Sequence, residues 1–569
     1  MPQGRRRAPF SGKAKKQQMQ EKKQRKNQIL LGQSHSSKDN DNCDDEEHQA
    51  GRSIKKINKQ PRDAGRNKYA LHFFQESQEE LRRRKEEAYQ TVEILPLNKQ
   101  EISDSYFPPE IDLPKRPPWD FNMSKDQLDI REQKYFREYL DNLNVEKLSF
   151  FELNLETWRQ LWRVMEMSDV LLIIVDIRFP VLMFPPYLYR YITVDLGKDM
   201  ILILNKIDLA PPSLVVAWRE YFKKHYPQLH ILMFTSYPHY NLRNSTTNET
   251  EGSLQKRRRK GKLKMSAEGA KQLLDTCKEI VGDKVDLTSW QEKIQEEMNS
   301  EYDLDDLGRK DNVTVLEKDL SYFEHEKFKN GVLTIGCLGT PNVGKSSLMN
   351  AIMGKKVVSV SRTPGHTKHF QTIFLTKTVC LCDCPGLVFP SIAPKQLQIL
   401  MGSFPIAQVR EPYTAVKFLA ERINLPQLLK LQHQDNDDTW SAMDICDSWA
   451  AKRNYKTAKA ARLDSYRAAN SLLRMALEGT ICLFIYPPGW STDRESLETH
   501  PDMEIVKWIQ AKSATEDKSK YSVSEDEESE SFESELSSKE STDSNNSDDE
   551  IKSETSEATN KFEILSTTK

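Results

Sequence analysis

A glycine-rich loop and a short polar turn stand in an unusual order in this chain. The loop, Gly339-Thr340-Pro341-Asn342-Val343-Gly344-Lys345-Ser346, matches G-x-x-x-x-G-K-[ST] and lies between a predicted strand, Val332–Leu338, and a predicted helix, Ser346–Met353. The turn, Asn205-Lys206-Ile207-Asp208, matches N-K-x-D, follows the predicted strand Met200–Leu204 and comes far upstream of the loop. Where both motifs occur, the loop usually comes first. The order therefore indicates an α/β domain whose two halves are exchanged along the chain.

The glycine-rich loop is typical of a phosphate-binding site. Backbone N–H groups at the start of a helix favour anions, and we expect those of Asn342–Ser347 to surround the phosphates of a nucleotide. Lys345 should reach the β- and γ-phosphates, and the Ser346 hydroxyl should ligate Mg²⁺. The predicted phosphate-binding residues are Gly339, Thr340, Pro341, Asn342, Val343, Gly344, Lys345, Ser346 and Ser347.

A second phosphate-end motif, Asp383-Cys384-Pro385-Gly386, ends the predicted strand Val379–Asp383. Asp383 is expected to hold the Mg²⁺ shell, and the Gly386 amide to sense the γ-phosphate. A threonine upstream should complete the Mg²⁺ coordination, and Thr367 is favoured over Thr363. Lys345, Thr367 and Gly386 are thus the predicted catalytic residues.

The polar turn is typical of guanine recognition. The Asp208 carboxylate can accept hydrogen bonds from the guanine N1–H and N2–H₂ groups, a donor pair that adenine lacks. Asn205 and Lys206 are expected to hold the base and the neighbouring loops. Thr235 and Ser236 follow the predicted strand Ile231–Phe234 and should back the base.

Together these motifs resemble the circularly permuted GTPases of the YlqF/YawG family. The order N-K-I-D, F-T-S, G-T-P-N-V-G-K-S, T-P-G-H-T, D-C-P-G is similar to theirs, and Asp176-Ile177-Arg178-Phe179-Pro180 resembles their D-x-R-x-P segment. Segments at 150–163, 209–212 and 455–462 resemble the HSR1 type within the family. The resemblance covers about residues 110–500.

The resemblance implies GTP and GDP as ligands, Mg²⁺ as cofactor and a low intrinsic rate of GTP hydrolysis. Leu387 stands where Ras-like enzymes place a catalytic glutamine, and it cannot orient a water molecule. Hydrolysis should then need a partner surface, His366 or a monovalent cation. Asn342 resembles the position that ligates K⁺ in potassium-stimulated GTPases. For His366, a solvent-facing switch histidine is the alternative to an acid/base role.

The same patterns predict the organisation of the chain. We expect a doubly wound, mostly parallel sheet in a permuted P-loop GTPase domain, followed by a mainly helical domain, with disordered tails. The predicted segments are a basic, mostly disordered arm (1–68), an extension packing on the core (69–148), the GTPase domain (149–410) with a polar insert (238–325), a C-terminal domain (411–512) and an acidic Ser-rich tail (513–569). A short strand is expected at Ile481–Tyr486 in the C-terminal domain.

Charge is distributed unevenly along the chain. The first 28 residues carry ten Lys/Arg and one acid, while residues 525–550 carry twelve acids and one Lys. The arm Arg5–Lys26 and the block Lys256–Lys264 fit contacts with pre-ribosomal particles or rRNA, or, alternatively, recognition by nuclear import receptors. Nucleus, nucleolus and cytoplasm, with shuttling, are the expected compartments. The tail serines Ser522, Ser524 and Ser529 suit phosphorylation, or the tail only solubilises.

Hydrophobicity and cysteines exclude other classes. No apolar run approaches the roughly 20 residues that span a bilayer, so no membrane role is expected. The closely spaced Cys380, Cys382 and Cys384 are interpreted as buried reduced thiols rather than metal ligands.

Three functions remain open. The leading hypothesis is a slow GTPase switch in large-subunit ribosome biogenesis or nucleocytoplasmic transport, in which switch ordering repositions the C-terminal helices. A GTP-regulated signalling adaptor and a non-hydrolysing GTP-bound scaffold are the alternatives.

Overall fold

The computed structural model describes residues 48–49, 52–57, 71–102, 106–144, 147–235, 264–299, 326–354, 357–361, 364–365, 367, 370–435, 437–457 and 461–511. Outside them lie the arm Arg5–Lys26, the tail from 513, and the predicted site residues Ser236, Thr363 and His366. Two compact units are distinguished, Met1–Ile54 and Lys55–Lys569. Close to the boundary between these two units, β1 (His48–Gln49) and β2 (Arg52–Ile57) pair antiparallel, with His48 opposite Ser53. No strand is predicted there from composition.

The centre of the second unit is a six-stranded sheet in the order β6-β5-β4-β7-β9-β8. Its strands are β4 (Val170–Asp176), β5 (Asp199–Asn205), β6 (His230–Phe234), β7 (Leu333–Leu338), β8 (Gln371–Phe374) and β9 (Val379–Asp383). All neighbours pair in parallel except β8 with β9. Every residue of β4 and β9 is buried, as expected for strands covered on both faces. The predicted mostly parallel α/β fold is confirmed; the antiparallel edge strand β8 is not predicted from the sequence.

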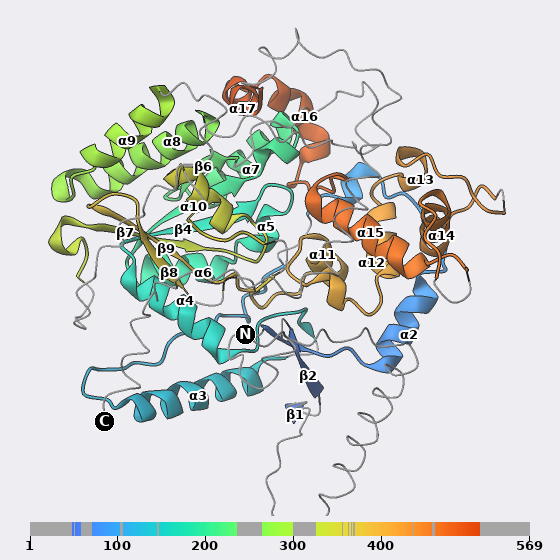
Figure 1. Ribbon diagram of the computed structural model, residues 1–569, viewed down its shortest axis with the longest axis horizontal. Helices are drawn as coiled ribbons and strands as arrows, with labels where there is room; N and C mark the ends of the chain where they lie inside the picture. Colours follow the sequence, from blue (N-terminus) through green and yellow to red (C-terminus); the bar gives the residue numbers. More distant parts are fainter. Residues whose placement is uncertain are drawn as a thin grey trace, which may run out of the picture. The chain divides into compact units, whose positions relative to one another are not determined.

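The pairing of β4 with β7 joins the two halves of the domain. Val170 lies opposite Ile335 and Ile173 opposite Leu338. β4 therefore lies between β5, which leads into the base motif, and β7, which leads into the phosphate loop. The carboxyl ends of parallel strands meet at one edge of a sheet, where ligands of such folds bind. The base and phosphate motifs are therefore brought to the same edge despite their separation in sequence (Figure 1).

Helices cover both faces of the sheet and continue beyond it (Figure 1). Those of the described residues that belong to the extension and the GTPase domain are α2 (Gln78–Glu87), α3 (Lys125–Asn142), α4 (Leu155–Met167), α5 (Pro180–Met183), α6 (Pro186–Arg190), α7 (Pro212–His225), α8 (Lys264–Val281), α9 (Thr288–Asn299), α10 (Lys345–Met353) and α11 (Lys395–Leu400). The C-terminal helices are α12 (Tyr413–Ala420), α13 (Leu425–Leu428), α14 (Ala442–Lys452), α15 (Ser465–Glu478), α16 (Trp490–Glu498) and α17 (Asp502–Ala511). This helical C-terminal region is confirmed. No helix among the described residues is both long and apolar enough to cross a membrane.

The N-terminal extension lies against both the sheet domain and the C-terminal helices. Arg116 and Arg159 share the buried carboxylate of Glu132, at 2.9 and 2.7 Å, and thereby join α3 to α4. The backbone N–H of Val92 donates to the Trp440 carbonyl at 2.8 Å. Residues 71–142 therefore connect two regions that lie far apart in the chain.

The insert contains a helical hairpin that the sequence does not predict. Helices α8 and α9 bury Leu273, Leu274, Cys277 and Trp290, and α8 packs on β6 and α10. Gly269 of α8 lies so close to Phe234 that an added Cβ would collide with its ring. The insert is polar in overall composition, and a prediction based on composition therefore misses the apolar residues that stand at helical spacing within it.

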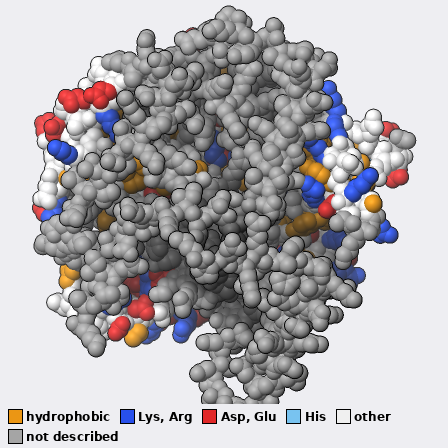
Figure 2. Space-filling model, in the orientation of Figure 1, with side chains coloured by type: hydrophobic (Ala, Val, Ile, Leu, Met, Phe, Trp, Pro, Cys, Tyr) orange, Lys and Arg blue, Asp and Glu red, His pale blue; other side chains and the backbone are white. Residues whose placement is uncertain are grey.

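The strand expected at Ile481–Tyr486 is wrong. Tyr486 forms only an isolated bridge to Glu101, while the Ile485 N–H donates to the Arg178 carbonyl at 3.0 Å. The segment is apolar because Ile481, Cys482 and Leu483 are buried, but its backbone groups bond to two different segments instead of one partner strand. In Figure 2, acidic and basic side chains of the described residues appear on the same face, with hydrophobic ones among them.

Candidate functional site

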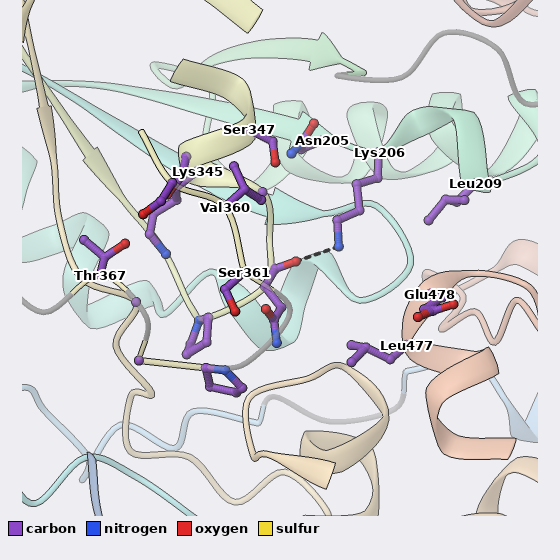
Figure 3. Close-up of a pocket in the computed structure, with 18 of the residues that line it drawn as sticks. Asn205, Lys206, Leu209, Lys345, Ser347, Val360, Ser361, Thr367, Leu477 and Glu478 are labelled. Carbon is purple, nitrogen blue, oxygen red and sulfur yellow. Dashed lines mark hydrogen bonds between the residues drawn. The ribbon is translucent and has the colours of Figure 1, made fainter. Parts of the chain in front are cut away.

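A cavity of about 260 Å³ lies at the carboxyl edge of the sheet (Figure 3). It brings together loops that follow β5, β7 and β9 with parts of the 359–367 segment and the end of α15. The residues that line it are Asn205, Lys206, Asp208, Leu209, Pro341, Asn342, Gly344, Lys345, Ser346, Ser347, Ser359, Val360, Ser361, Pro364, Gly365, Thr367, Gly386, Leu477 and Glu478. The phosphate-loop motif and the base-recognition turn therefore line the same cavity.

The phosphate loop has a backbone that requires glycine. Gly344 precedes α10 with φ +99°, and an added Cβ would lie 2.5 Å from Asn205 Nδ2. Gly339 has φ +147°, and its added Cβ would lie 2.5 Å from the Ile174 carbonyl oxygen. Both positions need the conformational range and the small size of glycine, so the loop can wrap closely and end in the helix N-terminus that favours an anion.

Lys345 lies inside this loop. Its side chain is buried, and Nζ donates to the carbonyls of Gly339 at 2.9 Å and Thr340 at 2.8 Å. Burial lowers the pKa of its ammonium group, although Asp383 opposes that shift. The amine is held by weak backbone acceptors, which phosphate oxygens can replace as stronger, charged partners.

Ser346 and Asp383 form an oxygen-rich pair at the end of β9. Ser346 Oγ donates to Asp383 Oδ2 at 3.1 Å, and among the described residues Asp383 Oδ1 is buried without a hydrogen-bond partner. Burial raises the pKa of Asp383, and the nearby Lys345 charge offsets that shift only in part. Thr367 lines the same cavity. A hydroxyl and a buried carboxylate with an unpaired oxygen are ligands that Mg²⁺ prefers, and these residues fit that ion.

Gly386 and Leu387 cross directly over the phosphate loop. An added Cβ on Gly386 would lie 2.8 Å from Pro341 Cα. The Leu387 N–H donates to the Gly339 carbonyl at 3.3 Å, and its side chain is buried. The side chain at this position therefore offers no polar atom for orienting water.

The base-motif residues form the opposite end of the cavity. Asn205 Nδ2 donates to the Val343 carbonyl at 2.7 Å, which joins this motif to the phosphate loop. Lys206, with φ +60°, donates to the Asn342 carbonyl at 2.6 Å. Thr235 Oγ1 donates to Asp208 Oδ1 at 2.5 Å and so positions that carboxylate.

Behind the base motif lies a buried ion network centred on Asp176. Arg178 donates to both of its oxygens, from Nε at 3.0 Å and from Nη2 at 2.9 Å, and Lys206 Nζ adds a bond at 2.8 Å. Burial alone would raise the pKa of Asp176, but the charges of Arg178 and Lys206 hold that pKa well below its usual range. Asp176 and Arg178, the first and third residues of the D-x-R-x-P segment, thus help to hold the Lys206 side chain in place.

Asn342, the expected K⁺ ligand, is engaged with the protein. The backbone of Asn342 has φ +62°, and its side-chain Nδ2 donates to the Gly402 carbonyl at 2.9 Å. This bond occupies the amide nitrogen, which is the half of the side chain that cannot ligate a cation.

Two lining residues, Leu477 and Glu478, are not predicted from the sequence. They come from α15, far from every motif, and belong to no phosphate- or base-binding pattern. Only the folded chain brings them to the cavity. Cys380, Cys382 and Cys384 are buried and form no disulfide among the described residues, and burial raises the pKa of Cys384 to about 12.

Comparisons with known proteins place this chain beside several GTPases. A family model described as 50S ribosome-binding GTPase matches residues 334–433. Guanine nucleotide-binding protein-like 1 of Mus musculus is 48% identical over 541 residues, covering 87% of this chain and 88% of that protein. Its Homo sapiens counterpart is 47% identical over 542 residues with the same coverage. Large subunit GTPase 1 homolog of Mus musculus is 32% identical over 429 residues, covering 66% of each chain.

Among solved structures, GDP-bound YlqF is 18% identical and aligns with a TM-score of 0.33 over 58% of this chain and 99% of that one. GNP-bound YlqF from T. maritima is 17% identical, with a TM-score of 0.33 over 58% of this chain and 98% of that one.

Proposed function

The chain belongs to the guanine nucleotide-binding protein-like 1 family, and from this membership we propose that it is a slow GTPase working as a nucleotide-dependent switch in large ribosomal subunit assembly. Guanine nucleotide binding and GTPase activity follow from the family itself. The rate, the switching and the biological process are the proposal.

The residue roles follow from the two ends of the cavity. Asp208 accepts from the guanine edge, while Lys345 and the amides of the phosphate loop bind the phosphates. Ser346, Asp383 and Thr367 would hold Mg²⁺, which when bound neutralises charge on the β- and γ-phosphates.

A low intrinsic rate follows from Leu387. Its side chain is buried and carries no hydrogen-bonding atom, so it cannot orient the attacking water. Another group then has to orient the water and neutralise charge during hydrolysis. K⁺ at the Asn342 oxygen and a partner surface are the proposed sources.

The observation that carries the switch is the attachment of the chain after Gly386. The Glu152 N–H donates to the Val388 carbonyl at 3.0 Å, Ser149 N–H to Ser391 at 2.9 Å, and Tyr187 Oη to Pro390 at 2.9 Å. This segment leads straight into α11 and the C-terminal helices. We propose that a shift of Gly386 on γ-phosphate binding changes these three bonds and is passed along the backbone to α11 and the helices after it, as in order–disorder switches of other GTPases.

The ribosomal role is supported by the descriptions of related proteins. The matched family model is described as a 50S ribosome-binding GTPase, and one relative is a large subunit GTPase 1 homolog. The basic arm Arg5–Lys26 suits phosphate-directed RNA contacts that weaken with salt. The proposed compartments are the nucleolus, nucleus and cytoplasm, with import receptors binding the same arm.

GTP hydrolysis by the purified full-length protein tests the proposal. It is measured in KCl and in NaCl, with and without large-subunit particles, and with Lys345→Ala as the blank. We expect slow turnover in NaCl and stimulation by K⁺, by particles, or by both, together with salt-sensitive co-sedimentation that depends on the bound nucleotide. Tight GTP binding without turnover under any condition would contradict the switch, and absence of co-sedimentation would contradict the ribosomal role.

A further inference from the structure

The last two residues of α15, Leu477 and Glu478, line the cavity from a helix of the C-terminal region. Figure 3 shows them on the side of Leu209 and Lys206, away from Lys345 and Thr367. They therefore lie at the end of the cavity where the nucleoside, rather than the phosphates, is expected.

The end of α15 is attached to the base motif through Arg178. Arg178 Nη1 donates to the Ala476 carbonyl at 2.8 Å, and Nη2 approaches the Leu477 carbonyl at 3.4 Å. Carbonyls at a helix C-terminus lack intrahelical partners and attract a cation, so this fully buried guanidinium suits that position. Because Arg178 also binds Asp176, which binds Lys206, one network positions α15 and the base motif together.

Two further contacts hold the loop around Asp208 to the C-terminal region. Gly479, with φ +80°, ends α15 so close to Leu209 that an added Cβ would lie 2.9 Å from Leu209 Cδ2. Gln510 Nε2 of α17 donates to the carbonyls of Ile207 at 2.7 Å and Ala210 at 2.9 Å, on either side of Asp208. The position of the guanine-reading carboxylate thus depends on helices outside the GTPase domain.

Leu477 lies beside Gly402, whose carbonyl also binds Asn342 of the phosphate loop. An added Cβ on Gly402 would collide with Leu477 Cδ1 and would lie 3.0 Å from Asn342 Nδ2. Leu477 therefore packs beside Gly402 and Asn342, whose carbonyl Lys206 binds. Its apolar side chain lines the same cavity as Lys206 and Leu209, where a ribose and base can pack.

The chemistry of Glu478 indicates which nucleoside group it meets. A carboxylate accepts hydrogen bonds, and the donors of a guanosine are its base-edge N–H groups and its ribose hydroxyls. Asp208 takes the base edge in the proposed orientation, so the ribose hydroxyls remain. Acidic residues bind ribose hydroxyls in the same way in dinucleotide-binding folds.

We propose that Leu477 and Glu478 form the nucleoside wall of the guanine nucleotide site, with Leu477 packing on the nucleoside and the Glu478 carboxylate accepting from a ribose hydroxyl. The C-terminal helical region is thereby part of the nucleotide site itself. This inference rests on the proposed orientation, with the base at Asp208 and the phosphates at Lys345.

Release of GDP and of 2′,3′-dideoxy-GDP from the full-length protein tests this wall. Glu478→Ala should release GDP about 10-fold faster than the wild type, as expected for loss of a hydrogen bond to a charged group, and should affect GTP equally. For dideoxy-GDP, wild type and variant should be alike. Leu477→Ala should speed release of both nucleotides. Glu495→Ala, at an exposed glutamate of α16, is the matched control.

The other results of these release measurements distinguish a wrong wall from a wrong nucleotide site. Release of GDP from Glu478→Ala at the rate of Glu495→Ala overturns the inference, and so does an equal effect on GDP and dideoxy-GDP. Glu478→Gln, which retains an acceptor oxygen, should keep most of the affinity and shows that the fold is intact. If Lys345→Ala also leaves GDP release unchanged, the proposed site itself is wrong; if Lys345→Ala alone weakens GDP binding, only the wall fails.

Discussion

The Asn342 side chain donates a hydrogen bond to the Gly402 carbonyl at 2.9 Å, and so ties the phosphate loop to the chain that leads into the C-terminal helices. The amide nitrogen makes this bond, while the amide oxygen is the atom suited to K⁺. The two proposed duties of Asn342 can therefore be separated by substitution.

Asn342→Asp should keep K⁺-stimulated hydrolysis and lose the link to Gly402, because aspartate retains the oxygen but cannot donate. Asn342→Ala should lose both. Titration of GTP hydrolysis with KCl measures the first property, and nucleotide-dependent protection of residues 395–404 from hydrogen exchange measures the second. Loss of K⁺ stimulation in Asn342→Asp would show that the side chain does not ligate the cation through its oxygen.

Gly344→Ala should abolish nucleotide binding. The substitution places a Cβ 2.5 Å from Asn205 Nδ2 at a residue with φ +99°, so either the loop or the base motif must move. Gly197→Ala is the matched control, because Gly197 also has positive φ, +60°, but nothing lies within 4 Å of an added Cβ. Fluorescent GDP binding and thermal melting compare the two; nucleotide affinity of Gly344→Ala near that of the control would contradict the expected clash.

Asp383→Asn should weaken the Mg²⁺ dependence of GTP binding. The asparagine keeps an oxygen for Ser346 but removes the buried carboxylate charge, and we expect about a 10- to 100-fold loss of Mg²⁺ affinity. Mg²⁺ titrations of GTP release measure the effect. An unchanged Mg²⁺ midpoint would exclude Asp383 from the metal site.

Arg178→Ala should destabilise the folded protein by about 3–5 kcal/mol, because it leaves the buried Asp176 with Lys206 as its remaining cationic partner and removes the donor to Ala476. Urea unfolding measures the change. Arg494→Ala breaks an exposed pair with Glu498 and should cost less than about 1 kcal/mol. Equal losses in the two variants would argue against a structural role for the Asp176 network.

Glu152→Gln should change the pH dependence of stability. Glu152 is fully buried; burial raises its pKa to about 8, against the opposing effect of hydrogen bonds from the His72 and Asn154 N–H groups. As pH rises from about 4.5 to about 8, the unfolded chain loses this proton while the folded chain keeps it, so stability falls over that window.

The glutamine variant lacks this proton equilibrium and should therefore gain stability relative to the wild type as pH rises, on the order of a few kcal/mol across the window. Urea unfolding at pH 5 and pH 8.5 compares the two proteins, with Glu495→Gln as the exposed control. A difference between variant and wild type that is the same at both pH values would contradict the raised pKa.

Local patterns were sufficient for the five parallel strands of the central sheet and for the loops at their ends. β4 is recognisable because burial on both faces selects a run of six apolar residues before Asp176, and α4 because its buried face repeats apolar residues at helical spacing. Strand β8 was missed because its residues are partly exposed and carry no such pattern. The segment Ile481–Tyr486 was mistaken for a strand because burial alone selects apolar residues, whatever partner the backbone finds.

The sequence by itself predicted the chemistry of this protein. It indicated which residues should bind phosphate and guanine, and that they come in permuted order, because glycines in the loop, a lysine at a fixed spacing from them and a carboxylate after a strand are local requirements. Only the tertiary structure decided that Arg178 joins Asp176 to the end of α15, and that Leu477 and Glu478 stand beside Asp208. Such contacts link positions about 300 residues apart (298 for Arg178 and Ala476), and they depend on how whole elements pack rather than on any spacing along the chain.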